Sequence, residues 1–209
     1  MKSESEICNS FNAHAAEYEQ FAKIQHEIGE RLFSRLQYLK MNPRFVLDLG
    51  CGTGHFSKRL QKYYPKAQII GLDFALNMLQ QAKYRMRFRK KWPLVNADMH
   101  QLPFADGIFD LVFANQVVHW ANPLNVVFAE LNRVMNTNGC IMFSTLGPDT
   151  FIELKQSWQH DPHAHTNDFL DMHDIGDALM QANLADPVVD MEMLAVHYKS
   201  LEQLLKALK

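Results

Sequence analysis

The sequence predicts an α/β protein built on a doubly wound, mostly parallel sheet. Short apolar runs alternate with segments of helical periodicity along the 209 residues, which is the pattern of strands joined by crossover helices. The first clear strand, residues 45–49, leads directly into the glycine-rich turn of residues 50–54 and then into a helix. This order is typical of a sheet that holds a small molecule across the carboxyl ends of its strands.

The elements follow from apolar spacing and from the residues that break it. Apolar residues recurring at intervals of three and four predict a helix from about residue 11 to 39, and Asn42-Pro43 ends it. Helices are expected after the glycine turn to about residue 64 and over residues 76–90, 123–135, 148–158, 169–183 and 201–208. Strands are expected over residues 45–49, 67–72, 93–96, 109–114, 140–145 and 188–198, with a turn at residues 136–139.

Composition narrows the class of protein. A chain of 209 residues with 47% apolar residues suits a single domain with a sizeable core, and a net charge of -2 argues against a binder of nucleic acid or anionic membrane. No apolar run approaches the length of a membrane span, and the first residues are polar and acidic. Cys8, Cys51 and Cys140 have no paired spacing, so we expect a cytoplasmic protein with free thiols and no metal site.

Three acids lie near the ends of the first three expected strands. Asp48, Asp73 and Asp98 therefore meet at one edge of a parallel sheet. The glycines are spaced G-x-G-x-G rather than as in the dinucleotide fingerprint. Asp73 can accept hydrogen bonds from both hydroxyls of a ribose, and the carboxylate of Asp98 with the backbone N–H of Met99 can bind an adenine edge. These features favour an adenosine-bearing cofactor other than a dinucleotide.

Four segments together resemble the class I S-adenosylmethionine-dependent methyltransferases: LDLGCGTG (47–54), GLDFA (71–75), NADMHQLPF (96–104) and FDLVFANQVVHW (109–120). The resemblance implies a Rossmann-like fold and S-adenosylmethionine as the cofactor. Asn115 and His119 would border its sulfonium and the methyl acceptor. The residues expected at the cofactor are Asp48, Gly50, Cys51, Gly52, Gly54, Asp73, Phe74, Met78, Asp98, Met99 and Asn115.

Other segments narrow the resemblance to the malonyl-acyl-carrier-protein O-methyltransferases of biotin synthesis, the BioC family. They are SFNAHAAEYEQFAKIQHEIGERL (10–32), FSTLGPDTFIELKQSW (143–158) and the stretch over residues 169–194. The resemblance implies a helical lid (1–42) carrying Tyr18, a cofactor-binding core (43–146) and an acceptor side (147–209). Tyr18 and His119 would orient the acceptor, a malonyl group on acyl carrier protein or malonyl-CoA. A carboxylate is already a nucleophile, so no general base is needed.

The chain departs from this family at its end. A complete fold of this type closes with a strand hairpin, whereas residues 188–198 can supply one strand and no closing strand follows. We therefore expect six strands, the last with an exposed edge that invites pairing with another chain.

Several readings stay open. The acceptor could instead be a quinone precursor or another small acid. A methyltransferase-like assembly factor, a protein hydroxylase or a cofactor-binding regulator would also share the fold.

The basic run between Lys83 and Lys91 favours a solvated helix end over a docking site for acidic carrier protein or RNA. His160, His163 and His165 match no zinc spacing and indicate a solvated loop, whereas His173 is expected near a helix start capped by a neighbouring acid.

Overall fold

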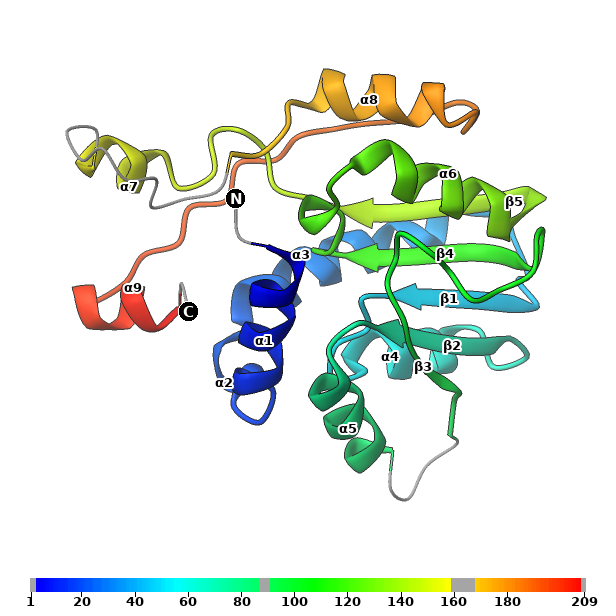
Figure 1. Ribbon diagram of the computed structural model, residues 1–209, viewed down its shortest axis with the longest axis horizontal. Coiled ribbons are helices and arrows are strands. Elements are labelled where there is room, and N and C mark those ends of the chain that lie inside the picture. Colours follow the sequence, from blue (N-terminus) through cyan, green and yellow to red (C-terminus); the bar gives the residue numbers. More distant parts are fainter. Residues whose placement is uncertain (1–2, 87–90, 159–167, 208–209) are drawn as a thin grey trace.

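The computed structural model describes residues 3–86, 91–158 and 168–207. Five parallel strands form one sheet in the order β3-β2-β1-β4-β5, as Figure 1 shows. Their bounds are β1 Phe45–Leu49, β2 Gln68–Asp73, β3 Leu94–Asn96, β4 Phe109–Asn115 and β5 Met135–Ser144. Each predicted strand up to residue 145 is present, so the predicted parallel α/β architecture is confirmed.

Helices cover both faces of the sheet. Successive strand side chains point to opposite faces, so Val112 of β4 joins the core beneath one helix layer while Phe113 joins the core beneath the other. The first layer contains α6 Leu124–Val134 and α8 Met172–Gln181, and the second contains α3 Lys23–Ser34 and α4 His55–Tyr63. Helix α5 Leu76–Arg85 follows β2 and packs beside β2 and β3. The sheet is therefore doubly wound.

The prediction of one continuous N-terminal helix is wrong. The segment instead forms α1 Glu4–His14, α2 Tyr18–Phe21, α3 and the 3-10 turn η1 Arg35–Tyr38. Ser3 and Glu6 begin α1 with a capping box, in which each side chain accepts from the backbone N–H of the other. The corners at Ala15 and Ala22 are buried. Burying these small residues bends the chain over the carboxyl ends of the strands, where α1 and α2 lie in Figure 1.

The turn expected at residues 136–139 lies inside β5. The pairing with β4 passes from Phe109 opposite Met135 to Leu111 opposite Cys140, so the four intervening residues bulge out of register. Asn136 accepts from the backbone N–H of Asn138 at 3.0 Å, which is the local hydrogen bond of an Asx turn. The predicted turn chemistry is present, but it forms a bulge within a strand.

The expected sixth strand is wrong within the described residues, where the sheet ends at β5. Residues 188–198 have no strand assignment, and Val188 is 94% exposed. The carboxylates of Asp190 and Glu192 pair with Arg35 and Arg31 at 2.7 and 2.6 Å, beside α3. Apolar alternation is not enough for a strand, because the backbone also needs a neighbouring strand to bond to.

The remaining helices test the predictions made for the second half of the chain. Helix α7 spans Ile152–Ser157 and α9 spans Leu201–Ala207. Asp171 caps α8 by accepting from the backbone N–H of His173 at 2.9 Å, so the predicted helix start there is confirmed. His160, His163 and His165 and part of the basic run lie outside the described residues.

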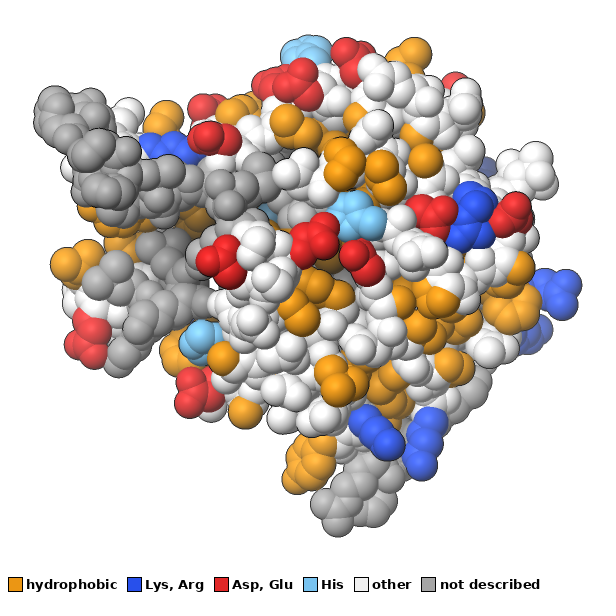
Figure 2. Space-filling model, in the orientation of Figure 1, with side chains coloured by type: hydrophobic (Ala, Val, Ile, Leu, Met, Phe, Trp, Pro, Cys, Tyr) orange, Lys and Arg blue, Asp and Glu red, His pale blue; other side chains and the backbone are white. Residues whose placement is uncertain are grey.

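No helix among the described residues combines the length and apolarity needed to cross a membrane. On the face in Figure 2, the described Lys and Arg side chains are scattered among apolar, neutral and acidic surface.

Candidate functional site

The carboxyl ends of β1 and β2 place the first two predicted acids side by side. Asp48 lies opposite Gly71, and Asp73 lies opposite Asn96 at the end of β3. Asp98 follows two residues beyond β3. Residues that are far apart in sequence therefore meet at one sheet edge, where open α/β sheets bind their ligands.

Asp73 is a buried carboxylate with two backbone partners. One oxygen accepts from the N–H of Gly52 and the other from the N–H of Ala75, both at 2.8 Å. Burial raises the pKa of Asp73 to about 6, although these hydrogen bonds act in the opposite direction. Its carboxylate thus ties the glycine turn to the end of β2. It also keeps unused lone pairs, because a carboxylate offers about four acceptor positions.

Asp48 is more deeply buried, with 2% of its surface exposed. It accepts from the hydroxyl of Ser57 in the first turns of α4. Burial raises the pKa of Asp48 to about 7. The structure therefore places Asp48 beneath the turn as a support between β1 and α4, and its predicted contact with the cofactor stays a prediction.

The glycine turn contains one tightly packed position and one open position. Gly50 has φ +65°, and a Cβ built there would lie 2.5 Å from Val117 Cγ2. Gly52 has φ +52°, but no described atom lies within 4 Å of a Cβ built on it. Gly54, with φ +79°, precedes α4. The turn thus presents bare backbone and open space at Gly52, as a bound molecule requires.

Cys51 contributes its backbone and a weak thiol contact to this turn, since its Sγ donates to the carbonyl of Gly52 at 3.8 Å. Its N–H donates to the carbonyl of Leu72 at 2.9 Å, and its sulfur would lie 3.0 Å from a Cβ built on Gly71. Burial raises the pKa of the Cys51 thiol well above its usual value. The thiol is therefore protonated and unreactive at neutral pH.

Asp98 and Met99 begin the loop between β3 and β4. Asp98 accepts from the backbone N–H of His100 at 2.8 Å and lies 2.7 Å from the His100 ring nitrogen. Its side chain is 49% exposed, whereas Met99 packs against the core. The side-chain amide of Asn96 donates to the carbonyl of Asp73 at 2.9 Å and so connects this loop with the end of β2.

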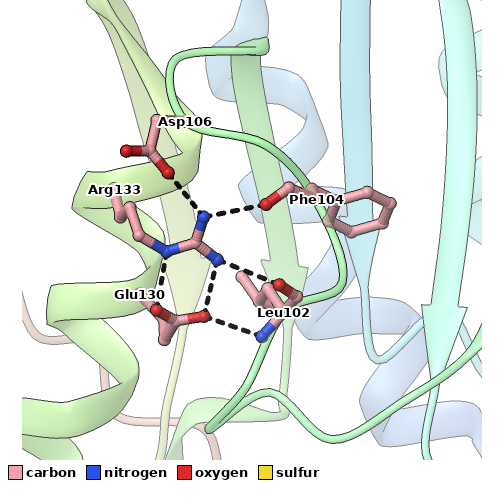
Figure 3. Close-up of polar contacts among 5 residues, drawn as sticks. All are labelled: Leu102, Phe104, Asp106, Glu130 and Arg133. Atoms are coloured by element: carbon pink, nitrogen blue, oxygen red, sulfur yellow. Dashed lines mark hydrogen bonds and ion pairs between the residues drawn. The ribbon is translucent and has the colours of Figure 1, made fainter.

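Arg133 of α6 holds the rest of that loop in place (Figure 3). Its guanidinium donates to the carbonyls of Leu102 and Phe104 at 2.9 and 2.8 Å and to the carboxylate of Asp106 at 2.7 Å. Glu130 accepts from the same guanidinium at 2.8 Å and from the N–H of Leu102 at 2.7 Å. These contacts raise the pKa of Arg133 above its usual value. They fix the path of the chain that leads away from the expected adenine site.

Replacing Arg133 by lysine is therefore expected to lower the free energy of unfolding by about 1 to 3 kcal/mol, because a point-charge ammonium cannot replace a forked donor. Urea unfolding measures this change. Arg31→Lys is the matched control, since Arg31 is an exposed ion-pair residue and should show little change. Equal midpoints for the two variants would contradict the proposed role of Arg133.

Tyr18 is the first residue of α2, and its side chain packs on the inner side of the lid against the end of β2 and α5. It packs with Ala75, Met78 and Phe74 in one apolar cluster. Burial, followed by the neighbouring charge of Asp73, raises the pKa of the Tyr18 phenol above its usual value. Tyr18 is therefore neutral at any physiological pH. Phe74 and Met78, both predicted to contact the cofactor, thus lie under the lid rather than on open surface.

Glu19, the next residue, ties the lid to the glycine turn. It accepts from the hydroxyl of Thr53 and pairs with Arg85 of α5 at 2.6 Å. Burial acts against ionisation, but these hydrogen bonds lower the pKa of Glu19. Sequence analysis missed this network, because nothing in the local pattern pairs residue 19 with residue 53.

A row of aromatic rings crosses from the end of β2 to the chain beyond β5. Phe11 of α1 meets Phe74 at 6.1 Å and Trp120 at 5.9 Å between ring centroids. His119 continues the row, at 4.9 Å from Trp120 and 5.7 Å from Phe169. This aromatic row, whose members are all half-buried, runs from the end of β2 to the expected acceptor side.

His119 is the polar member of the aromatic row. Its Nδ1 is buried and has no hydrogen-bond partner among the described residues. Burial lowers the pKa of His119 to about 4, so its ring is neutral at pH 7. A neutral, unpaired imidazole buried beside Trp120 and Phe169 can donate or accept one hydrogen bond to a ligand.

Asn115 is already engaged at the end of β4. Its amide nitrogen donates to the backbone carbonyl of Gln25 at 2.9 Å, and its amide oxygen accepts from the Ser144 hydroxyl at 2.8 Å. Asn115 therefore fastens α3 to the sheet. Sequence analysis missed Gln25 and Gln116, whose side chains each bury one amide atom without a partner in the described chain.

Two groups of side chains could offer three metal ligands each. The groups are Glu19, His26 and His55, and Glu4, Asp98 and His100. In the first, the histidine rings are stacked at 4.0 Å with an interplanar angle of 21°. Lone pairs in such nearly parallel ring planes do not converge on one ion. We therefore assign no metal to the first group, and the two exposed acids of the second group are of a kind that is common without a metal ion.

Two open depressions of the surface, of about 350 and 420 Å³, share Asp110 and Asn136 near the amino end of β4. Asp110 already accepts from the backbone N–H groups of Arg44 and Phe45 at 2.6 and 2.9 Å. The lid helices α1 and α2 lie over the opposite edge of the sheet (Figure 1).

The fold and this sheet edge define a class of protein: an S-adenosylmethionine-dependent methyltransferase. The family described as "Methyltransferase domain" matches residues 47–143. This chain belongs to the malonyl-[acyl-carrier protein] O-methyltransferases. A relative of that name from Legionella pneumophila is 60% identical over 98% of this chain and 72% of its own length. Another, from Gallionella capsiferriformans, is 44% identical over 96% of this chain and 71% of its own length.

Solved structures agree at the level of the fold. A Haloferax volcanii methyltransferase, solved with the Trm112 methyltransferase activator, has a TM-score of 0.67 at 18% identity, covering 94% of this chain and 91% of that chain. A Haemonchus contortus N-methyltransferase solved with S-adenosylhomocysteine has a TM-score of 0.59 at 19% identity, covering 74% and 36%.

The residues present fit the cofactor. Gly52 leaves open space over bare backbone, and Asp73 keeps free acceptor positions beside it. The unpartnered oxygen of Gln25 and nitrogen of His119 are orphaned buried polar atoms at the same end of the sheet. In native proteins, buried polar atoms of this kind meet a ligand or an ordered water.

Proposed function

We propose that this methyltransferase esterifies the free carboxylate of a malonyl thioester carried by acyl carrier protein, an early step of biotin synthesis. The two relatives reported above carry that activity in their names. The structural observation that carries the proposal is the protonation state of the two residues expected beside the acceptor. Tyr18 has a raised pKa and His119 a lowered pKa, so both are neutral.

Neutral neighbours suit a carboxylate acceptor. A carboxylate attacks without losing a proton, so the site needs orientation and dryness rather than a general base. Bound S-adenosylmethionine would supply the methyl group on a positively charged sulfur, and its transfer to the carboxylate oxygen would leave a neutral S-adenosylhomocysteine sulfur and a methyl ester. Both charges fade, so a site from which water is excluded favours the reaction.

Each predicted residue then has a role. Asp73 binds the ribose, and Asp98 with Met99 binds the adenine. The backbone of Gly50, Cys51, Gly52 and Gly54 lies beneath the methionine portion, supported by Asp48 and covered by Phe74, Met78 and Asn115. Tyr18 and His119 position the acceptor carboxylate in line with the S–CH₃ bond.

The test is methyl transfer from labelled S-adenosylmethionine to malonyl-acyl carrier protein, compared with malonyl-CoA, free malonate and acetyl-acyl carrier protein. We expect a base-labile methyl ester on malonyl-acyl carrier protein and none on the acetyl form, which has no free carboxylate. Rescue of a biotin-requiring strain is the matching test in cells. Equal labelling of acetyl-acyl carrier protein would refute the proposed acceptor.

Substituting the two positioning residues should slow turnover without changing its pH dependence. Tyr18→Phe and His119→Ala each remove one hydrogen bond, so we expect kcat to fall about tenfold in each. Because neither group moves a proton, the pH profile between 6.5 and 8.5 should keep its shape. Turnover close to that of the unmodified enzyme in both variants would remove these residues from the mechanism.

We also propose that residues 1–42, 43–146 and 147–209 act together as lid, cofactor core and acceptor side of one domain. Asn115, which joins α3 to β4, and Glu19, which joins α2 to the glycine turn, support this proposal. A cytoplasmic location is supported by the free thiols of Cys8, Cys51 and Cys140.

A further inference from the structure

Gln25 lies where the lid crosses the glycine turn. Its backbone carbonyl accepts from the side chain of Asn115 at the end of β4. The next residue, His26, stacks on His55 at 4.0 Å, directly after Gly54. The first turn of α3 therefore contacts both the end of β4 and the start of α4, which follows the glycine turn.

Close packing of α3 fixes this position. A Cβ built on Gly29, one turn after Gln25, would lie 2.1 Å from the ring of Phe56 and 2.8 Å from the amide nitrogen of Asn115. Only glycine allows this approach. The helix is consequently held against α4 and β4 by its backbone, without any need for the Gln25 side chain.

The side chain of Gln25 is thus free for another use. Its amide oxygen is buried, yet no described residue donates a hydrogen bond to it. A buried acceptor without a donor lowers the stability of the folded protein, and in native proteins such an atom usually meets a ligand or water. A positively charged donor is the strongest partner for it.

We propose that the Gln25 side chain binds the amino-acid end of the cofactor, its amide oxygen accepting a hydrogen bond from the α-ammonium group. The methionine portion is expected over the glycine turn, and the turn of α3 that carries Gln25 contacts His55, the residue that follows Gly54, through the ring of His26. The lid thereby becomes part of the cofactor site. This inference depends on the cofactor and is independent of which acceptor the enzyme uses.

The test compares two ligands that differ only in the amino-acid end. S-adenosylhomocysteine carries the α-ammonium group, and methylthioadenosine lacks the entire amino-acid group. For Gln25→Leu we expect calorimetric affinity for S-adenosylhomocysteine to fall about 10- to 100-fold. Affinity for methylthioadenosine should stay within about twofold.

Two further variants sharpen the test. Gln25→Glu places a negative charge at the α-ammonium group, so it should bind S-adenosylhomocysteine at least as tightly as the unmodified protein does. Gln20→Leu, at an exposed position of the same lid, is the matched control and should leave both affinities unchanged. The proposal is overturned if Gln25→Leu weakens both ligands equally or neither, or if Gln25→Glu weakens S-adenosylhomocysteine as much as leucine does.

Discussion

Gly52→Ala is expected to bind S-adenosylhomocysteine at least about 100-fold more weakly while remaining folded. The added Cβ meets no described atom of the protein, so the core pays no steric penalty. Holding alanine at φ +52° costs about 1 to 2 kcal/mol of folding free energy. The Cβ instead occupies the open space over the turn, where the cofactor must approach bare backbone. Calorimetry gives the affinity, and urea unfolding gives the stability.

Substitutions at two other glycines separate the effect of backbone strain from the effect of filling the cofactor site. Gly107 has φ +68°, and the nearest atom to a Cβ built there is the carbonyl oxygen of Met135 at 4.0 Å. Gly107→Ala should therefore lose similar stability but keep its affinity, because it lies at the other end of β4. Gly50→Ala adds a collision with Val117 to the same strain, so it should lose far more stability. Normal cofactor binding by Gly52→Ala would mean that the cofactor does not lie over the turn.

The sequence was informative wherever the signal is contiguous. The segment from β1 through Gly54 contains an apolar strand, an acid and three glycines in one short stretch, so both its structure and its place at a sheet edge were predictable. The three acids could also be assigned to the same edge, because each lies at or just beyond the carboxyl end of its own strand in a parallel sheet. Local order along the chain was enough in these cases.

Contacts between distant segments were not predictable from one sequence. The pairing of Glu19 with Thr53, and of Asn115 with the Gln25 carbonyl, depends on how far the lid bends at Ala15 and Ala22. Helical periodicity continues through those corners and conceals them. The failed strand at residues 188–198 has a related cause, since strand formation depends on a neighbour that apolar alternation does not reveal.

Asp73→Asn should weaken S-adenosylhomocysteine binding about 100-fold or more. The carboxylate can accept charge-assisted bonds from both ribose hydroxyls, each contributing about 1.5 to 3 kcal/mol, and an amide offers only one acceptor oxygen. Asp110→Asn is the matched control. Asp110 also accepts from two backbone N–H groups, but it lies at the opposite sheet edge. It should lose stability without losing affinity, and an equal loss of affinity in both variants would contradict the ribose assignment.

The pH dependence of binding gives the same assignment an independent test. Burial raises the pKa of Asp73 to about 6 in the free protein, above its ordinary value, so its protonated form stabilises the fold below that pH and this contribution is lost as pH rises through 6. The ribose hydroxyls require the opposite, ionised form. Affinity should therefore fall as pH drops below 6, approaching tenfold per unit. Asp48, with a pKa of about 7 raised in part by the charge of Asp73, remains in Asp73→Asn, so the difference between the two profiles reports Asp73 together with its coupling to Asp48. A difference profile that stays flat between pH 5 and 7 would place the ribose on another residue.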